Sequence, residues 1–201
     1  MDITKSKLAV VLSKLRVFNN AKLKLEQYPA DSEVAATVLW NAYMQGDIKD
    51  KTIADLGAGT GILGIGALIL GARKVYLVEK DEAALEILRE NLTSYKRHEI
   101  ISQDIIRFNK KTDTIVQNPP FGTKEKHTDR LFLEKAFSLT RVIYSFHKTA
   151  TRDFIGKLAQ KHNFAITQEH GFDFPLKKTY NHHKRDIHRI KVSCFRFQKK
   201  Q

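Results

Sequence analysis

The sequence predicts an α/β protein built on a doubly wound, mostly parallel sheet of seven strands, with the last strand antiparallel and a helical annex at the N-terminus. Three observations support this prediction. From residue 51 onward, short apolar runs alternate with amphipathic segments, the pattern of parallel strands joined by crossover helices. A glycine-rich turn follows the first run and opens the next helix. The last run follows its predecessor through a polar loop without a helix, so these two runs are expected to pair as a hairpin.

The first 50 residues are expected to form the annex. Apolar side chains recur at a helical period in residues 4–18, which predicts a first helix. Asp31 or Ser32 can cap a second helix that continues through Met44. No Pro/Gly/Ser-rich linker follows these helices, so the whole chain is expected to form one domain with the annex packed on it.

The remaining elements follow from hydrophobic period and from the glycines and polar residues that interrupt it. The predicted strands are 52–56, 74–79, 99–102, 114–117, 142–146, 164–169 and 187–197, and the predicted helices between them are 62–70, 81–95, 129–139 and 152–161.

The composition indicates a globular protein with a full hydrophobic core. The chain has 201 residues, 42% of them hydrophobic, and a single cysteine, Cys194. One cysteine can form neither an internal disulfide nor a zinc cluster, and no metal site is expected. No apolar run approaches the roughly 18 residues of a membrane span, and the N-terminus lacks a signal-peptide core. We therefore expect a cytoplasmic protein without a membrane partner.

The strongest compositional signal is the formal net charge of +13. Residues 171–201 alone carry nine Lys and Arg against two Asp and Glu, together with three of the eight histidines. This imbalance favours a polyanionic partner, and nucleic acid in particular, because basic side chains release counterions from phosphates. Charge that merely keeps the protein in solution is the alternative, and charge does not distinguish RNA from DNA.

The residues Asp55-Leu56-Gly57-Ala58-Gly59-Thr60-Gly61 form the glycine turn. Glycines let the backbone turn tightly and let a ligand approach closely. Glu79 lies twenty residues beyond Gly59 at the end of the second predicted strand, where a carboxylate can accept from both hydroxyls of a ribose. Asp104 ends the third strand, where it can accept from an adenine amino group.

Two classes of cofactor compete for this turn. Residues 59–64 match the dinucleotide pattern G-x-G-x-x-G, with Glu79 at the expected distance. A P-loop is excluded because no Gly-Lys-Ser or Gly-Lys-Thr follows. Asp55, two residues before Gly57, suits the amino-acid part of a sulfonium cofactor better than a pyrophosphate. Asp104, after the third strand, and the Asn118-Pro119-Pro120-Phe121 motif, after the fourth, also favour S-adenosylmethionine.

The motif after the fourth strand is Asn118-Pro119-Pro120-Phe121. Pro119 restricts Asn118 to an extended conformation, and neither proline can donate to a sheet. The Asn118 amide is therefore held stiffly at the carboxyl end of a strand, where open α/β sheets bind ligands. The carbonyls of Asn118 and Pro119 lack competing local N–H groups. Two acceptors beside the Phe121 ring suit a planar exocyclic amine, whereas a Pro-Pro turn with a buried Phe is the alternative.

With both motifs in view, the chain resembles the class I S-adenosylmethionine-dependent methyltransferases that act on amino groups, which have a Rossmann-like fold. The closer likeness is to methyltransferase-like protein 5 and its archaeal relatives, a family that makes N6-methyladenosine in small-subunit ribosomal RNA. Asn-Pro-Pro-Phe alone is shared with guanine-N2, cytosine-N4 and glutamine-N5 enzymes, so the extension through Lys124 adds specificity. The matching segments are 26–29, 55–57, 118–124, 128–129, 144–148 and 180–184, which together run through most of the chain.

The motifs and the resemblance together imply a set of site residues. The catalytic residues are expected to be Asn118, Pro119, Pro120 and Phe121. The cofactor-binding residues are expected to be Gln27, Tyr28, Asp55, Gly57, Ala58, Gly59, Thr60, Gly61, Leu63, Glu79, Lys80, Asp104, Ile105 and Asn118. The RNA-binding residues are expected to be Phe121, Lys124, His147, Lys148, Tyr180, His183 and Lys184.

The resemblance also implies a partner. Relatives of this type act with a small zinc-binding activator subunit that adds a strand to the edge of the sheet. The predicted strand 99–102 is expected to offer such an edge.

Two positions depart from the family pattern, and two competing functions stay open. Ala30 replaces a Thr that many relatives carry, which removes a hydroxyl contact to the cofactor, and Ala58 replaces a Cys at a position that contributes mainly backbone. A glutamine-N5 protein methyltransferase shares the fold and Asn-Pro-Pro, but the positive charge favours RNA. An RNA-binding scaffold without catalysis would have no need to keep Asp55, Glu79 and Asn118 together.

Overall fold

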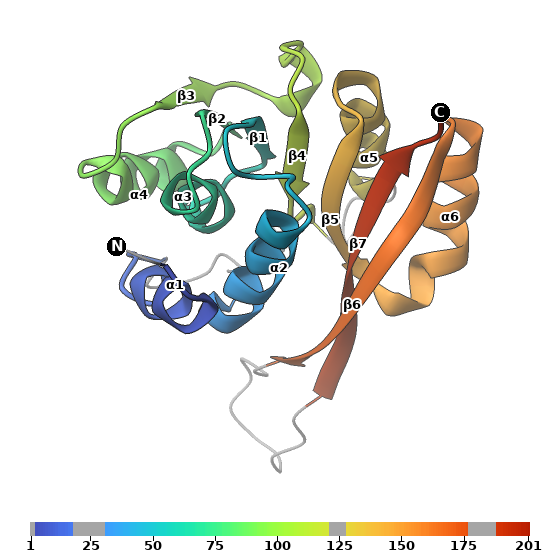
Figure 1. Cartoon of the computed structure of the whole chain (residues 1–201), viewed down its shortest axis with the longest axis horizontal. Coiled ribbons are helices and arrows are strands. Elements are labelled where there is room, and N and C mark those ends of the chain that lie inside the picture. Colours follow the sequence, from blue (N-terminus) through green and yellow to red (C-terminus); the bar gives the residue numbers. More distant parts are fainter. Residues whose placement is uncertain (1–2, 18–30, 121–127, 177–187) are drawn as a thin grey trace.

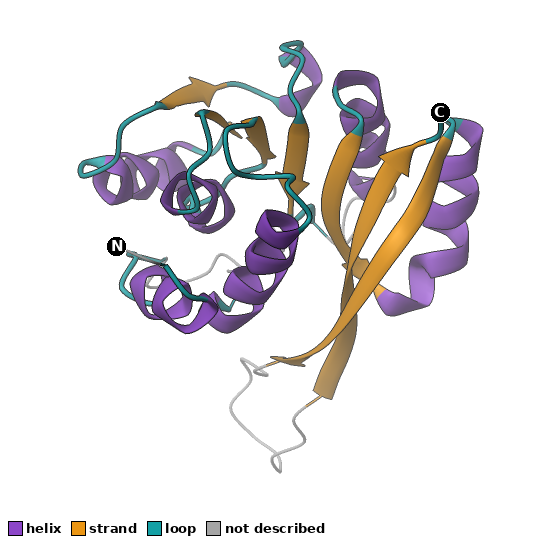
Figure 2. Cartoon of the chain, in the orientation of Figure 1, coloured by secondary structure: helices purple, strands orange, loops and turns teal. Residues whose placement is uncertain are grey.

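The computed structural model describes residues 3–17, 31–120, 128–176 and 188–201. These residues form six helices and seven strands (Figures 1 and 2). The helices are α1 (Lys5–Leu12), α2 (Ser32–Met44), α3 (Ile62–Ile69), α4 (Glu82–Leu92), α5 (Thr128–Leu139) and α6 (Arg152–Lys161), with short 3-10 helices at Ile105–Arg107 and Thr149–Thr151. The strands are β1 (Thr52–Leu56), β2 (Lys74–Glu79), β3 (His98–Ser102), β4 (Thr114–Gln117), β5 (Val142–Lys148), β6 (Phe164–Leu176) and β7 (His188–Lys199).

The strands form one sheet in the order β3-β2-β1-β4-β5-β7-β6. β1 to β5 run parallel to one another, whereas β7 is antiparallel to both β5 and β6. The predicted doubly wound sheet with an antiparallel last strand is therefore confirmed. The strand order reverses between β1 and β4, and in such sheets ligands bind at the carboxyl ends of the strands that flank this switch point.

Helices cover both faces of the sheet (Figure 1). On one face, α1, α2, α3 and α4 bury their apolar side chains in a common core with residues of β1, β2, β5 and β7. On the other face, α5 and α6 pack with the opposite side chains of the same sheet. The N-terminal annex thus shares a hydrophobic core with the strands. Among the residues described, no helix has the length and apolar character needed to cross a membrane.

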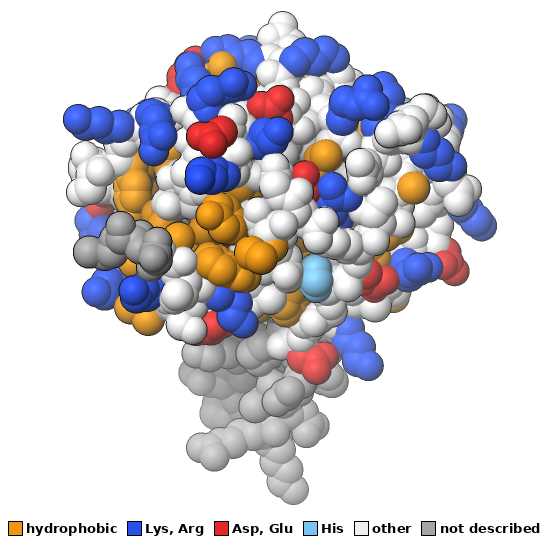
Figure 3. All heavy atoms as spheres, in the orientation of Figure 1, with side chains coloured by type: hydrophobic (Ala, Val, Ile, Leu, Met, Phe, Trp, Pro, Cys, Tyr) orange, Lys and Arg blue, Asp and Glu red, His pale blue; other side chains and the backbone are white. Residues whose placement is uncertain are grey.

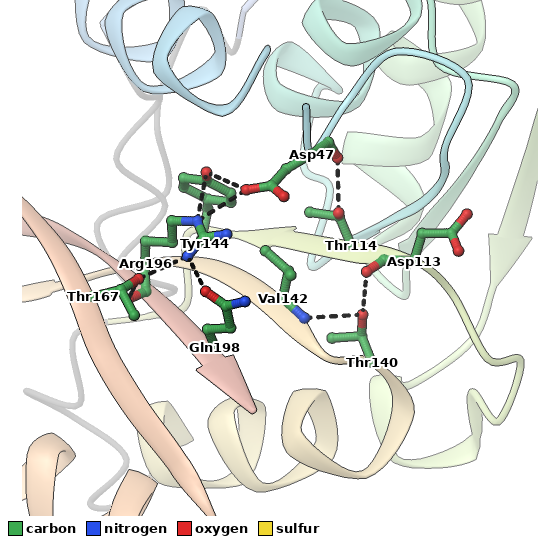
Figure 4. A network of polar contacts seen from close by, with 9 residues as sticks. All are labelled: Asp47, Asp113, Thr114, Thr140, Val142, Tyr144, Thr167, Arg196 and Gln198. Atoms are coloured by element: carbon green, nitrogen blue, oxygen red, sulfur yellow. Dashed lines mark hydrogen bonds and ion pairs between the residues drawn. The ribbon is translucent and has the colours of Figure 1, made fainter. Parts of the chain in front are cut away.

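A buried polar network joins the annex to four strands (Figure 4). Asp47, three residues after α2, receives hydrogen bonds from the Tyr144 hydroxyl of β5 at 2.7 Å and from Arg196 Nε of β7 at 2.9 Å. The Thr114 hydroxyl of β4 donates to the Asp47 carbonyl at 2.7 Å. Arg196 Nη1 donates to Thr167 and Gln198. Because Asp47, Tyr144 and Arg196 are each at most 9% exposed, this network fixes the end of α2 against the sheet.

Two elements differ most in length from the predictions. The first helix ends at Leu12 rather than at residue 18, because the chain turns onto α4, where the Arg16 N–H donates to Asn91 Oδ1 at 2.9 Å. β6 continues to Leu176 because β7 pairs with it all the way to His188. The ribbon of β6 and β7 therefore extends past the carboxyl end of β5, as the lower part of Figure 1 shows.

Candidate active site

The glycine turn and the Asn118 motif leave neighbouring strands at the same level. Leu56 is the last residue of β1, Gln117 is the last residue of β4, and the two are paired across the parallel ladder. Gly57 and Asn118 are the next residues along each strand. The two motifs, which lie 61 residues apart by number, are thus adjacent at the switch point of the sheet.

The backbone of the glycine turn has the geometry that the sequence predicts. The N–H groups of Gly57 and Ala58 both donate to the Val78 carbonyl at the end of β2, at 2.9 and 3.0 Å. Gly59 has a φ of +56°, and a side chain there would meet nothing within 4 Å. Gly61 has a φ of +95°, and a Cβ there would lie 2.4 Å from Leu88. Gly61 is therefore required for packing, whereas Gly59 borders open space that a ligand can enter.

The carboxylate of Glu79 is fixed at the end of β2. Its Oε2 accepts from the Gly59 N–H at 2.8 Å, and its Oε1 accepts from the N–H groups of Lys80 and Asp81 at 2.8 and 2.9 Å. Glu79 is 9% exposed. Because a carboxylate has about four acceptor positions, it can hold the turn in place and still accept from a ligand.

Asp55, the last but one residue of β1, is buried with 1% exposure. Its Oδ2 accepts from the Gly64 N–H in the first turn of α3 at 2.8 Å. Burial raises the pKa of Asp55 to about 7, the Gly64 hydrogen bond opposes this shift, and the nearby Glu79 charge adds to it. In this structure the carboxylate therefore holds the start of α3 and carries a proton over part of the physiological pH range.

This shift predicts a pH dependence of stability. In the unfolded chain the Asp55 pKa is near 3.8, so between pH 4 and 7 the folded state holds a proton that the unfolded state has released. The free energy of unfolding should consequently fall by about 2 kcal/mol from pH 5 to pH 8 through this group alone. In Asp55→Asn, which keeps an acceptor for Gly64, that contribution should vanish. Urea unfolding of both proteins at the two pH values measures the difference, and parallel pH profiles would contradict it.

The predicted cofactor residues after β3 lie beside those of β2. Asp104 Oδ1 accepts from the Ile106 N–H at 3.0 Å, and its Oδ2 lies 3.0 Å from Lys80 Nζ. The hydrogen bond from Ile106 is the main cause that lowers the pKa of Asp104, so this carboxylate is ionised. Ile105 is buried in the core of the α5 face. The structure thus brings Lys80, Asp104 and Ile105 together at the ends of β2 and β3.

Asn91 of α4 supports the glycine turn, and the sequence analysis missed it. Its Nδ2 donates to the Thr60 carbonyl at 2.9 Å and to the Arg16 carbonyl at 3.0 Å. In the sequence, the only indication of this role is that Asn91 is a polar amide between Leu88 and Leu92, on the apolar side of α4.

The catalytic motif is described as far as Pro120. Asn118 and Pro120 are half-buried, and Pro119 is buried. The predicted residues that lie outside the described part of the chain are Gln27, Tyr28, Phe121, Lys124, Tyr180, His183 and Lys184.

His147 lies in the interior, which corrects the prediction that it binds RNA. It is 1% exposed, and burial lowers its pKa to about 3, so the ring is neutral. Its Nε2 lies 2.7 Å from Ser145 Oγ, which accepts from Gln117 Nε2 at 2.9 Å. A neutral buried ring cannot act as a phosphate-binding cation. Lys148, the next residue, is half-buried at the end of β5. Gln117 and Ser145 were not among the predicted site residues.

Comparison with known proteins assigns the family. The model of the methyltransferase small domain family matches residues 30–140, more than half of the chain. The chain belongs to this family. The matched region contains the glycine turn, Glu79, Asp104 and Asn118, so every predicted cofactor contact in the described residues lies within the methyltransferase domain.

Individual proteins are similar to this methyltransferase over nearly its whole length. A zebrafish (Danio rerio) protein named rRNA N(6)-adenosine-methyltransferase METTL5 is 37% identical over 191 residues, which cover 90% of this chain and 91% of that protein. The crystal structure of PH1948 from Pyrococcus horikoshii is 41% identical, with a TM-score of 0.87 over 99% of this chain and 98% of that one. TYW2 from M. jannaschii, solved in complex with AdoMet, is 19% identical with a TM-score of 0.55 over 81% of this chain and 76% of that one, which shows a common fold alone.

The described residues of the methyltransferase fit S-adenosylmethionine. Gly59 leaves open space over the turn, and Glu79 presents an anchored carboxylate next to it. Asp104 presents an ionised carboxylate at the end of the neighbouring strand. Within the residues that the structure describes, no group of three or more His, Cys, Asp or Glu side chains is arranged to hold a metal ion.

Proposed function

We propose that this methyltransferase transfers a methyl group from S-adenosylmethionine to the N6 atom of an adenosine in ribosomal RNA, and that the small subunit carries the target. The pairing of Leu56 with Gln117 is the observation that carries the proposal, because it sets the cofactor turn and Asn118 side by side. The relatives named as rRNA N6-adenosine methyltransferases support the choice of atom and of RNA.

Each part of the cofactor has a residue to hold it. Glu79 would hold the ribose hydroxyls, Asp104 would hold the adenine amino group, and the backbone from Gly57 to Gly61 would hold the methionine part. Asp55 would hold the amino group of that part, and Gln27 and Tyr28 would contact the same part. The cofactor supplies an electrophilic methyl group on its sulfonium.

Asn118 and Pro119 hold the target amine. The lone pair of adenine N6 is delocalised into the ring, so the amine must be oriented before it can attack. Its two hydrogens donate to the Asn118 side-chain oxygen and the Pro119 carbonyl, while Phe121 stacks on the base and contributes roughly 1–3 kcal/mol. Pro120 keeps the turn rigid. Positioning and electrostatics then carry the rate, and no nucleophilic residue is needed.

The surface charge supports an RNA substrate. Lys and Arg side chains are spread over much of the face in Figure 3. Lys148 lies at the carboxyl end of β5, and the ribbon of β6 and β7 extends past that end. Lys124, Lys148, Tyr180, His183 and Lys184 are the proposed RNA contacts. An enzyme with a ribosomal substrate is expected in the cytoplasm.

A small zinc-binding activator subunit is the proposed partner, with β3 as its docking edge. β3 is an outer strand of the sheet. Four of its five residues are half-buried, and an outer strand leaves one row of backbone N–H and C=O groups for another chain.

Replacing Glu79 by alanine should weaken cofactor binding about tenfold to 100-fold, since hydrogen bonds to charged groups are worth about 1.5–3 kcal/mol. The exposed Glu86 of α4 is the matched control, and Glu86→Ala should bind as the wild type does. Isothermal titration with S-adenosylmethionine measures both. Equal affinities would remove Glu79 from the cofactor site.

A transfer assay tests the function itself. Tritiated S-adenosylmethionine is incubated with the enzyme and, in separate reactions, with ribosomal RNA, ribosomal protein and tRNA. Label in ribosomal RNA that is recovered as N6-methyladenosine supports the proposal. Label in protein glutamine would identify a glutamine-N5 enzyme instead, and RNA binding without label would identify a scaffold.

A further inference from the structure

A buried chain of three polar side chains lies directly behind the catalytic motif. Gln117 Nε2 donates to Ser145 Oγ at 2.9 Å, and Ser145 Oγ lies 2.7 Å from His147 Nε2. The exposed fractions of the three residues are 0%, 0% and 1%. The chain therefore crosses from the last residue of β4 to the end of β5 within the core.

Stability alone does not account for this buried hydrogen-bonded chain of side chains. Among the described residues, Gln117 Oε1 and His147 Nδ1 are buried without a hydrogen-bond partner. An unsatisfied buried polar atom is costly, and apolar side chains of similar shape would avoid that cost. Apolar residues do occupy the preceding inward positions of both strands, Ile115 and Ile143, which are paired with each other.

The position of this hydrogen-bonded chain, next to the catalytic motif, suggests its function. Backbone pairing of β4 with both neighbours stops at Gln117. The motif continues with Pro119 and Pro120, which have no N–H and cannot extend the ladder. The side-chain hydrogen bond from Gln117 to Ser145 therefore ties the end of β4 to β5 at the residue directly before Asn118.

We propose that Gln117, Ser145 and His147 are positioning residues that fix the carboxyl end of β4, and with it the orientation of the Asn118 side chain toward the target amine. This inference rests on the proposed function of Asn118. The hydrogen bond that ends on Ser145 holds Gln117 in one rotamer, and His147 holds the Ser145 hydroxyl. Because catalysis by positioning is sensitive to small displacements, loosening this tether lowers turnover without touching the cofactor.

The protonation state of His147 fits a positioning role. The ring is buried, its centroid lies 6.3 Å from that of the Phe195 ring of β7, and Ser193 is its register partner. It stays neutral at working pH because burial disfavours its charged form. The same hydrogen-bond pattern is therefore present whenever the enzyme is active.

Four variants test this inference. Ser145→Ala breaks the middle of the hydrogen-bonded chain, and His147→Met removes its far end while an apolar side chain fills the buried space. His147→Gln keeps a hydrogen-bonding group at the end of the side chain. Thr114→Val is the matched control, because Thr114 is equally buried at the other end of β4 and its hydroxyl donates to the Asp47 carbonyl at 2.7 Å. For each variant we measure kcat with RNA, the Kd for S-adenosylmethionine and the side-chain amide resonances of Asn118.

In Ser145→Ala and His147→Met, kcat should fall about tenfold to 100-fold, the cofactor Kd should stay within about twofold, and the Asn118 resonances should broaden or split. His147→Gln should recover a large part of kcat, and Thr114→Val should match the wild type in all three. Wild-type kcat and sharp Asn118 resonances in Ser145→Ala would overturn the inference. If the wild type methylates no RNA, the proposed function fails, and the Asn118 resonances still decide whether this chain positions that side chain.

Discussion

Asn118→Ala should lower methyl transfer about 100-fold to 1000-fold, the loss seen when one fixed polar group that stabilises a transition state is removed. The alanine removes the oxygen that orients the target amine, while the Pro119 carbonyl and the glycine turn remain. The Kd for S-adenosylmethionine should change much less than turnover, because Glu79, Asp104 and the glycine turn still hold the cofactor. Single-turnover transfer to RNA and calorimetric titration of the cofactor measure the two effects separately.

Two further variants sharpen this prediction. Asn118→Asp keeps an oxygen acceptor and should retain more activity than the alanine variant. Asn109→Ala changes an exposed asparagine away from the strand ends and should behave as the wild type. Near-normal turnover in Asn118→Ala would show that the amine is not held by this side chain.

Arg196→Met should lower the free energy of unfolding by about 3–5 kcal/mol, the cost of removing one partner of a buried ion pair. The Arg196 and Asp47 side chains are only 9% and 12% exposed, and their atoms lie 2.9 Å apart. The variant leaves the Asp47 carboxylate buried with the Tyr144 hydroxyl as its remaining side-chain donor in the described network (Figure 4). Urea unfolding at pH 7 measures the loss.

The control for this prediction is an exposed ion pair. Arg130 and Glu134 pair across one turn of α5 at 2.9 Å, with side chains 44% and 30% exposed. Arg130→Met should cost at most about 0.5 kcal/mol. The double variant Asp47→Asn with Arg196→Met should recover part of the loss, since it leaves no buried charge. Equal effects of Arg130→Met and Arg196→Met would contradict the assigned role of the network.

The features that local sequence determines were predicted correctly. β1, β2, β4 and α6 begin and end at the predicted residues, because charged residues, glycine or proline lie at or close to both ends of each element. The glycine turn and the Asn118 motif were also found locally, since Gly59 and the two prolines restrict the backbone wherever they occur.

The features that were missed depend on contacts between distant segments. Asn91 supports Thr60 only because α4 packs beside the glycine turn. His147 reads as a polar strand end, yet β5 continues to Lys148 and pairs with β7 along its whole length, so His147 lies inside the sheet. The chain from Gln117 to His147 depends on the register between β4 and β5, which neither strand encodes alone.

A crystal structure with S-adenosylhomocysteine and adenosine tests the central claim most directly. We predict that the ribose hydroxyls of the cofactor product contact Glu79 above Gly59, and that the adenosine N6 lies within hydrogen-bond distance of both the Asn118 side-chain oxygen and the Pro119 carbonyl. The account would be contradicted if the glycine turn were empty, or if Asn118 faced away from the amine.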